Sequence, residues 1–246
     1  MARPMPGRPR GRLIAVEGGS AAGKTTVVQA AARRFGWVPL AEAYDRLDPA
    51  PSLEFATPAE LLRLEATLLA EEVRRYRAAR SACVRGRTVL ADTGFLGPLT
   101  YTRALARLGR APVSVSRALE RSARALVRDG SMGIPDLTVY LRTTTRERSL
   151  RAARDADRHP LRLRSRHEAV GRVERRYFED LFPRVRPPRF LSLRAGSDPE
   201  VLGTRLAALV ETGPTEPATR ADALAILTAL TRERTVRAGP RAGPNR

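Results

Sequence analysis

The sequence predicts an α/β fold built on a parallel sheet. Short apolar runs alternate with longer stretches of helical periodicity along the chain, and this alternation is typical of parallel sheets. The chain has 246 residues, of which 42% are hydrophobic, which is enough for one large domain with a sizeable core. A glycine-rich segment directly after the first apolar run also fits a strand that is followed by a helix.

In the first half of the chain, residues 1–11 are predicted to be a disordered basic arm. The helix that follows the glycine-rich turn is expected to end near Gly36, because glycine readily adopts the conformation that terminates helices. A second helix begins where Thr57 and Glu60 can form a capping box around Pro58. The predicted elements are a strand at 13–16, a helix at 24–35, a strand at 37–40, a loop at 45–56, a helix at 57–84 and a strand at 88–91.

Glycine and proline also divide the second half of the chain. A break near residues 109–112 separates two helices between 95 and 129, and His159–Pro160 interrupts an arginine-rich helical segment. The other predicted elements are a strand at 137–141, a helix at 166–182, a strand at 190–193 and helices at 199–211 and 219–234. The predicted organisation is a main domain at 12–212 with an arginine-rich lid at about 146–165, a linker and C-terminal helix at 213–234, and a disordered tail at 235–246.

The composition indicates a cytoplasmic protein. Cys83 is the only cysteine, so one chain contains no disulfide or cysteine zinc site. The first residues lack the apolar core of a signal peptide, and no apolar run is long enough to span a bilayer. The formal charge of +19 would suit nucleic acid, a membrane surface or small anions. Arginine enrichment of the kind that a GC-rich genome produces explains the charge without any partner.

A phosphate-binding motif stands between the first strand and the first helix. Gly18, Gly23, Lys24 and Thr25 fit G-x-x-x-x-G-K-[ST]. The two glycines let the backbone fold around an anion, and the loop amides point toward it. The residues predicted to bind the phosphates of ATP are Gly18, Gly19, Ser20, Ala21, Ala22, Gly23, Lys24, Thr25 and Thr26.

Lys24 is the only lysine among 45 basic residues. Its ammonium is a compact charge on a slim stem, whereas the broad guanidinium of arginine does not fit the same cradle. A chain that otherwise uses arginine would therefore keep lysine at this position. We expect Lys24 to reach the terminal phosphates of ATP and to act in catalysis.

A magnesium site is predicted from two residues. Thr25 offers its hydroxyl, and Asp92 ends an apolar strand where the carboxylate of a Walker B motif would lie. Asp92 begins an Asp-Thr-Gly sequence, so a turn or a helix cap is the alternative role.

An arginine run follows the fourth predicted strand. Arginines there could neutralise a transferring phosphoryl group and close over it as a lid, although a solvated helix face is the alternative for each of them except Arg151. Arg151 is the catalytic candidate, and Arg154 and Arg158 are candidates for nucleotide binding.

Three segments together resemble the thymidylate kinases and deoxynucleoside kinases, as a divergent member. They are "IAVEGGSAAGKTT", "TVLADTGFLGPLTYTRAL" and "PDLTVYLRTTTRERSLRAARDADR", and the resemblance covers roughly residues 12–211. It implies a five-stranded parallel sheet with helices on both faces and a mobile lid. Glu17 before the motif narrows the resemblance to these kinases, Arg151 matches their arginine just before the lid, and Tyr101 matches a tyrosine of the helix after the Asp motif.

Departures from that family bear on the phosphoryl acceptor. The family has Asp-Arg where this chain has Asp92-Thr93. Thymidylate kinases also carry an arginine just after the second strand, whereas this chain has no arginine between Arg34 and Arg46. Glu42 instead matches the carboxylate with which deoxynucleoside kinases take a proton from the acceptor hydroxyl. A loop surface residue is the alternative for Glu42, and Asp45 is a weaker candidate for the same role.

The sequence therefore predicts a kinase that uses ATP and magnesium to phosphorylate a hydroxyl of a nucleoside-like small molecule. The alternatives are a thymidylate (nucleoside monophosphate) kinase, a phosphotransferase for an antibiotic or another small alcohol, and a non-enzymatic, nucleotide-gated basic module that binds nucleic acid. The charge favours the last, but only 5% of residues are aromatic, which argues against stacking on single strands. Phe55, Leu64 and Tyr101 are candidate walls for a flat acceptor. The helices at 57–84 and 219–234 could each form a homodimer interface.

Overall fold

The computed structural model describes residues 11–49, 54–154, 165–196 and 198–233. Residues 1–10 of the predicted basic arm, residues 155–164 of the predicted lid and the predicted tail lie outside this part. In the described residues, the chain forms a five-stranded parallel sheet with strand order β2-β3-β1-β4-β5. The strands are β1 (Leu13–Glu17), β2 (Val38–Leu40), β3 (Val89–Asp92), β4 (Leu137–Arg142) and β5 (Phe190–Arg194).

The helices follow the strands in the predicted order. They are α1 (Lys24–Phe35), α2 (Pro58–Val84), α3 (Gly97–Arg107), α4 (Val113–Arg128), α5 (Thr145–Arg154), α6 (Ser165–Arg176), α7 (Phe182–Val185), α8 (Pro199–Thr212) and α9 (Arg220–Arg232). Short 3-10 turns lie at Tyr44–Arg46 and Pro187–Arg189. The capping box of Thr57 and Glu60 starts α2 as predicted, because each residue binds the other's backbone N–H.

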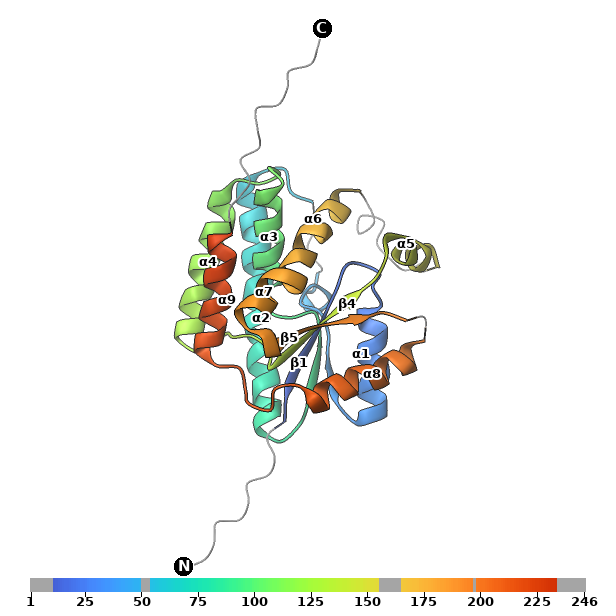
Figure 1. Ribbon diagram of the computed structural model, residues 1–246. Helices are drawn as coiled ribbons and strands as arrows, with labels where there is room; N and C mark the ends of the chain where they lie inside the picture. Colours follow the sequence, from blue (N-terminus) through green and yellow to red (C-terminus); the bar gives the residue numbers. More distant parts are fainter. Residues whose placement is uncertain (1–10, 50–53, 155–164, 197, 234–246) are drawn as a thin grey trace, which may run out of the picture.

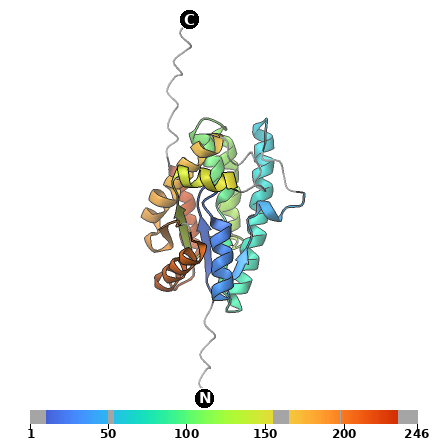
Figure 2. The same ribbon diagram turned by 90° about the vertical axis from the view of Figure 1, so that its right-hand side faces the viewer.

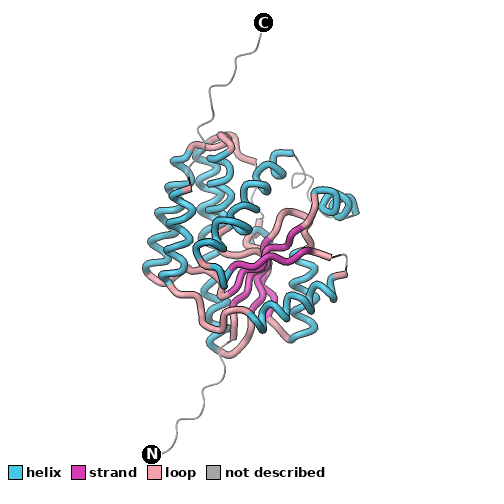
Figure 3. Tube along the Cα trace, viewed as in Figure 1, coloured by secondary structure: helices cyan, strands magenta, loops and turns pink. Residues whose placement is uncertain are grey.

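Helices cover both faces of the sheet, so the predicted fold class is confirmed. Alternate residues of β1 point to opposite faces: Leu13 and Ala15 join the core under α2, α3 and α4, whereas Ile14 and Val16 join the core under α1 and α8. Figure 1 and Figure 2 show α1 and α8 together on one face, and Figure 3 shows the sheet between the two helical layers. No helix in the described part of the chain is long and apolar enough to cross a membrane.

The helix predicted at 166–182 is not uniform. Residues Tyr177–Leu181 form a wider π-helical turn between α6 and α7. Pro183 follows this turn; it has no N–H to donate, and its ring would clash with the carbonyl four residues earlier in a regular α-helix. The wider turn accommodates the proline without ending the helix.

The C-terminal helix is part of the same core. Ala223, Ile226, Leu227 and Leu230 of α9 are buried in the cluster that also contains residues of β1, α2 and α4. Arg103 of α3 donates to the backbone oxygen of Thr231 at 3.0 Å. The apolar face of α9 that the sequence offered for a homodimer is therefore covered within the chain.

The carboxyl ends of the strands meet at one edge of the sheet. The register pairs Val16 of β1 with Asp92 of β3, and β1 lies between β3 and β4. The glycine-rich loop after β1, Glu42 after β2 and α5 after β4 are thereby brought to the same edge. Ligands bind at this edge in parallel α/β sheets.

Candidate active site

The loop between β1 and α1 has the conformation that the motif predicts. Gly18 has φ +152° and Gly23 has φ +91°, and only glycine adopts such angles without strain. The loop closes through a hydrogen bond of 3.1 Å from the Ala22 N–H to the Gly19 oxygen. Ala21 also has a positive φ, at 61°, which is a strained conformation of the kind that clusters at functional sites.

The predicted phosphate-binding residues are held together by this loop. Lys24 is the first residue of α1, and its Nζ donates to the Gly18 oxygen at 3.2 Å. Ser20 lines the adjoining cavity, and Thr25 and Thr26 are exposed in the first turn of the helix. The amides of that first turn have no partner within the helix and carry the positive end of its dipole. The arrangement suits a bound phosphate.

Thr25 and Asp92, the two residues of the predicted magnesium site, are in direct contact. The Thr25 hydroxyl donates to Asp92 Oδ2. Asp92 Oδ1 is buried and has no hydrogen-bond partner in the described part of the chain. Burial raises the pKa of Asp92, while the nearby Lys24 ammonium and the Thr25 hydrogen bond lower it. A carboxylate with a free oxygen beside a hydroxyl is a donor set that fits Mg²⁺.

The arginines of α5 reach the phosphate loop. Arg151 donates to the Ala22 oxygen at 2.6 Å and to the Gly196 oxygen at 2.7 Å. Arg148 lies one turn earlier, and a Cβ added to Gly19 would come within 2.8 Å of its Nη1. The sequence included Arg148 in the arginine run without distinguishing it from its neighbours. The Arg154 side chain and all of Arg158 lie outside the described residues.

A cavity of about 480 Å³ adjoins the loop. Glu42, half-buried, and Lys24 both line it, so the structure brings the predicted base and the predicted phosphate-binding lysine to one space. Tyr101 lines it too, whereas Phe55 packs against the hydrophobic core. Leu64 is half-buried and Asp45 exposed, and neither is among the residues that line the cavity.

The cavity contains glutamates that the sequence analysis missed. Glu65 and Glu72 of α2 and Glu17 of β1 are buried along its wall, and Glu174 of α6 is half-buried there. A signal was present, because Glu65 falls midway between the apolar Leu61 and Leu69 on the buried stripe of α2. Glutamate on an apolar stripe is an exception that indicates either a buried partner or a site.

Burial perturbs all four of these carboxyl groups. Desolvation raises the pKa of Glu17 to about 8, against a hydrogen bond from the Gly94 N–H. Desolvation likewise raises the pKa of Glu72 to about 7, against its ion pair with Arg75, and that of Glu174 to about 7, against a hydrogen bond from Thr100. It raises the pKa of Glu65 well above the usual range, and the nearby Glu174 adds to the shift. Perturbed groups of this kind cluster at functional sites.

Thr93 occupies the position after Asp92 where the sequence lacks an expected arginine. It has φ +62°, and a buried arginine lies beneath it from another element. Arg75 of α2 is fully buried, and its Nη2 donates to the backbone oxygen of Asp92 at 2.8 Å and to the backbone oxygen of Thr93 at 3.3 Å. The guanidinium therefore supports the backbone of the predicted metal site, and it also pairs with Glu72 in the cavity wall.

The segment that contains the candidate active site matches a known protein family. A family of AAA domains matches residues 13–162, which include the phosphate loop and Asp92. The chain belongs to this family. No curated protein sequence matches it.

The fold of this AAA-domain protein resembles solved structures whose sequences differ widely from its own. The deoxyadenosine kinase from M. mycoides with bound dATP is 14% identical with a TM-score of 0.66, and the match covers 81% of this chain and 99% of that one. The thymidylate kinase from Candida albicans is 16% identical with a TM-score of 0.58, and the match covers 82% of this chain and 92% of that one. The predicted P-loop kinase fold is confirmed, and the low identity agrees with a divergent member.

Proposed function

We propose that this protein is a kinase that transfers the γ-phosphoryl group of ATP, with magnesium, to a hydroxyl of a small, nucleoside-like molecule. One observation carries the proposal: the phosphate loop and Glu42 line one cavity, and the Thr25–Asp92 pair lies beside it, close enough to Lys24 and Glu42 for their charges to shift the pKa of Asp92. A phosphoryl donor site, a metal site and a proton acceptor are the parts that such a transfer needs.

Thr25 and Asp92 would hold the magnesium ion, and the unpartnered Asp92 Oδ1 supports this role. When bound, magnesium neutralises charge on the phosphate oxygens. Lys24, released from the Gly18 oxygen, would place its ammonium on the terminal phosphates. Arg148 and Arg151, which already contact the loop, would stabilise negative charge that spreads over the transferring group.

Glu42 would accept the proton of the acceptor hydroxyl. The hydroxyl oxygen forms a bond to the γ-phosphorus, the bond from that phosphorus to its bridging oxygen breaks, and ADP leaves. Glu42 takes the proton that the hydroxyl loses. Glu17 is a second candidate for this role, because its pKa of about 8 lies close to the operating pH that favours a general base.

The charge of the cavity favours a hydroxyl acceptor over a phosphate acceptor. Six glutamates line the cavity, against the two cations Lys24 and Arg148, both at the phosphate loop. A nucleoside monophosphate would bring a further negative charge into this surrounding without the arginines that such an acceptor needs. The thymidylate kinase alternative therefore ranks second, and side-by-side turnover of thymidine and thymidine monophosphate would separate the two.

The experiment that tests the proposal is a transfer assay with ATP and magnesium over a panel of nucleosides, nucleotides and small alcohols, with products identified by mass spectrometry. We expect Lys24→Ala to abolish transfer while the fold remains intact, because the half-buried Lys24 side chain bonds to the phosphate loop at the Gly18 oxygen. Lys24→Arg should also be severely impaired, since the cradle fits a narrow side chain. Transfer to none of the acceptors by the wild type, or near-normal transfer by Lys24→Ala, would refute the kinase.

Glu42→Gln tests the acceptor class. General-base help is typically worth about 100- to 10,000-fold in rate, so turnover should fall within that range while affinity for ATP stays near that of the wild type. Glu211→Gln on the exposed face of α8 is the matched control and should have no effect. If Glu42→Gln retains turnover and Glu17→Gln does not, Glu17 is the base. If both retain it, a phosphate acceptor moves ahead.

A further inference from the structure

The cavity is lined by acidic residues in a chain that is strongly basic. The sequence carries a formal charge of +19, yet the cavity wall presents six glutamates and only two cations. Composition alone would place arginines here, as it does elsewhere on the surface. The cavity therefore departs from the trend of the chain, and its charge needs an explanation of its own.

One of these glutamates, Glu65, has no hydrogen-bond or ion-pair partner in the part of the chain that the structure describes. Glu65 is only 3% exposed, and within the described residues no hydrogen bond or ion pair engages its carboxylate. The residue lines the cavity, and the charged group that shifts its pKa is another carboxylate, Glu174. Ionising a buried carboxyl group without a partner costs several kcal/mol, which a positively charged partner would offset. The missing partner has to carry positive charge or hydrogen-bond donors, and it has to come from the cavity.

The partner is larger than a metal ion. In the described part of the chain, no three His, Cys, Asp or Glu residues are placed so that they could hold a metal ion. The carboxylates come from β1, α2 and α6 and surround a space of about 480 Å³, which is the size of a small organic ligand. Tyr140 and Phe178 stack with ring centroids 5.7 Å apart and add aromatic surface to the wall, which also suits an organic cation.

We propose that the phosphoryl acceptor is a hydroxyl compound that carries at least one ammonium group, and that Glu65 and Glu174 bind this group. This inference rests on the proposed kinase function and specifies its acceptor. The ammonium lies between two carboxylates that otherwise repel each other, while a hydroxyl of the same molecule faces Glu42 and Lys24. Amino sugars, aminocyclitols and aminonucleosides belong to this chemical class.

The test compares charged and uncharged forms of the same acceptors. The probes are glucosamine, 2-deoxystreptamine and 3′-amino-3′-deoxyadenosine, each as the free amine and as the N-acetyl derivative, which keeps the hydroxyls and loses the charge. Binding to the full chain is measured by calorimetry with magnesium and a non-hydrolysable ATP analogue. At least one free amine should bind at least about 10-fold more tightly than its N-acetyl form, since a hydrogen bond to a charged group is worth about 1.5–3 kcal/mol.

Variants then assign the charge recognition to specific residues. Glu65→Gln and Glu174→Gln keep size and hydrogen-bonding capacity, and each should weaken the amine by about 10- to 100-fold without changing the affinity of its N-acetyl form. Glu211→Gln is the control for an exposed glutamate. Circular dichroism checks that each variant folds, and the two cavity variants give independent readings.

The outcomes separate the acceptor proposal from the kinase proposal. Equal or tighter binding of the N-acetyl compounds, no measurable binding of any free amine, or unchanged amine affinity in both cavity variants would overturn the ammonium acceptor. Transfer of phosphate to a neutral hydroxyl compound would keep the kinase and remove the ammonium. Amine binding that depends on Glu65 without any transfer would keep the cationic site and remove the kinase.

Discussion

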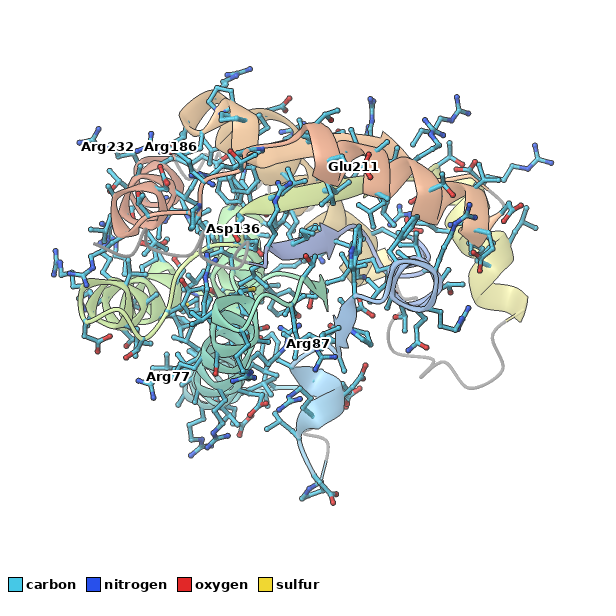
Figure 4. All side chains as sticks on the ribbon, turned by 90° about the horizontal axis from the view of Figure 1, so that it is seen from below. Arg77, Arg87, Asp136, Arg186, Glu211 and Arg232 are labelled. Carbon is cyan, nitrogen blue, oxygen red and sulfur yellow. The ribbon has the colours of Figure 1, made fainter. Side chains whose placement is uncertain are left out.

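Asp136 and the cavity glutamates lie at opposite ends of the sheet, and they differ in how many hydrogen-bond partners they have. Asp136, 2% exposed, lies just before β4. Its Oδ1 accepts from Arg80 at 2.7 Å and from the Ala218 N–H at 2.8 Å, and its Oδ2 accepts from the Leu13 N–H at 2.8 Å. Figure 4, seen from below, shows Asp136 in the middle of the molecule, far from the outline where Arg232 lies.

The glutamates at the other end have few partners. Glu65 has none among the described residues, and Glu174 accepts one hydrogen bond, from Thr100 at 3.0 Å. Both groups are buried, so burial alone does not distinguish structure from function. The number of satisfied oxygens distinguishes them: both oxygens of Asp136 accept hydrogen bonds that hold the fold together, whereas Glu65 and Glu174 have few partners among the described residues.

The largest expected effect comes from breaking the satisfied group. Asp136→Ala leaves Arg80 with an unpaired buried charge and two backbone N–H groups without acceptors. Removing one member of a buried pair typically costs about 3–5 kcal/mol, so the free energy of unfolding in urea should fall by that amount. Asp136→Asn keeps two acceptor positions and should cost less. A loss below about 1 kcal/mol for the alanine variant would remove the distinction drawn here.

An effect of opposite sign is expected in the cavity. Glu174→Gln removes a charge that the fold does not neutralise, so this variant should be more stable than the wild type at pH 8. The raised pKa means that folded Glu174 holds a proton between pH 4.5 and about 7, where the unfolded chain has lost it, so stability falls as pH rises through this window. The group faces Lys24, Glu42, Glu65, Glu17 and Tyr140.

The size of the gain follows from the width of that window. The rise in the pKa of Glu174 corresponds to roughly 3 kcal/mol in the free energy of unfolding at pH 8. The stability gained by Glu174→Gln should vanish at pH 4, where both forms of the chain hold the proton. Chemical unfolding of the wild type and Glu174→Gln across this pH range measures both values. A variant that is less stable than the wild type at pH 8 would show that the Glu174 carboxylate contributes to the fold, as Asp136 does.

The smallest expected effect sharpens the comparison within the cavity. Thr100→Val removes the hydroxyl that donates to Glu174 while keeping the side-chain volume, and it should cost about 1 kcal/mol at pH 8. That hydrogen bond lowers the pKa of Glu174, so its loss should move the fall in stability to higher pH. The midpoint of stability against pH, measured for both proteins, checks this, and an unmoved midpoint would place the titration on another group.

The fold and the phosphate loop could be predicted because their signals are local. The capping residues of α2 and the apolar run of β4 lie next to the elements that they define, and Gly18 to Thr25 form one continuous motif. Asp92 was found because it ends a strand. The π-helical turn at Tyr177–Leu181 was missed, although Pro183 marks the place, since a proline more often ends a helix than widens one.

The acidic cavity could not be predicted from the sequence because it forms from segments that are far apart along the chain. Glu65 and Glu174 are 109 positions apart in the sequence, and only the packing of α3 against both α2 and α6 brings the carboxylates to one space. Each glutamate on an apolar stripe was visible in the sequence. The sequence could not show whether each glutamate pairs with an arginine, as Glu72 does with Arg75, or lines a cavity with other glutamates. Only the structure shows that Glu65 and Glu174 line the same cavity.

The contacts of Asp136 also bear on the order in which the protein folds during synthesis. This one side chain binds β1 near the start of the chain, Arg80 in its first third and the linker before α9 near residue 218. The apolar face of α9 fills the core that β1 and α4 leave open. A nascent chain that has not yet released α9 from the ribosome therefore exposes part of that core, and contacts between such distant segments form slowly. The core that α9 covers would thus be completed only after α9 has emerged.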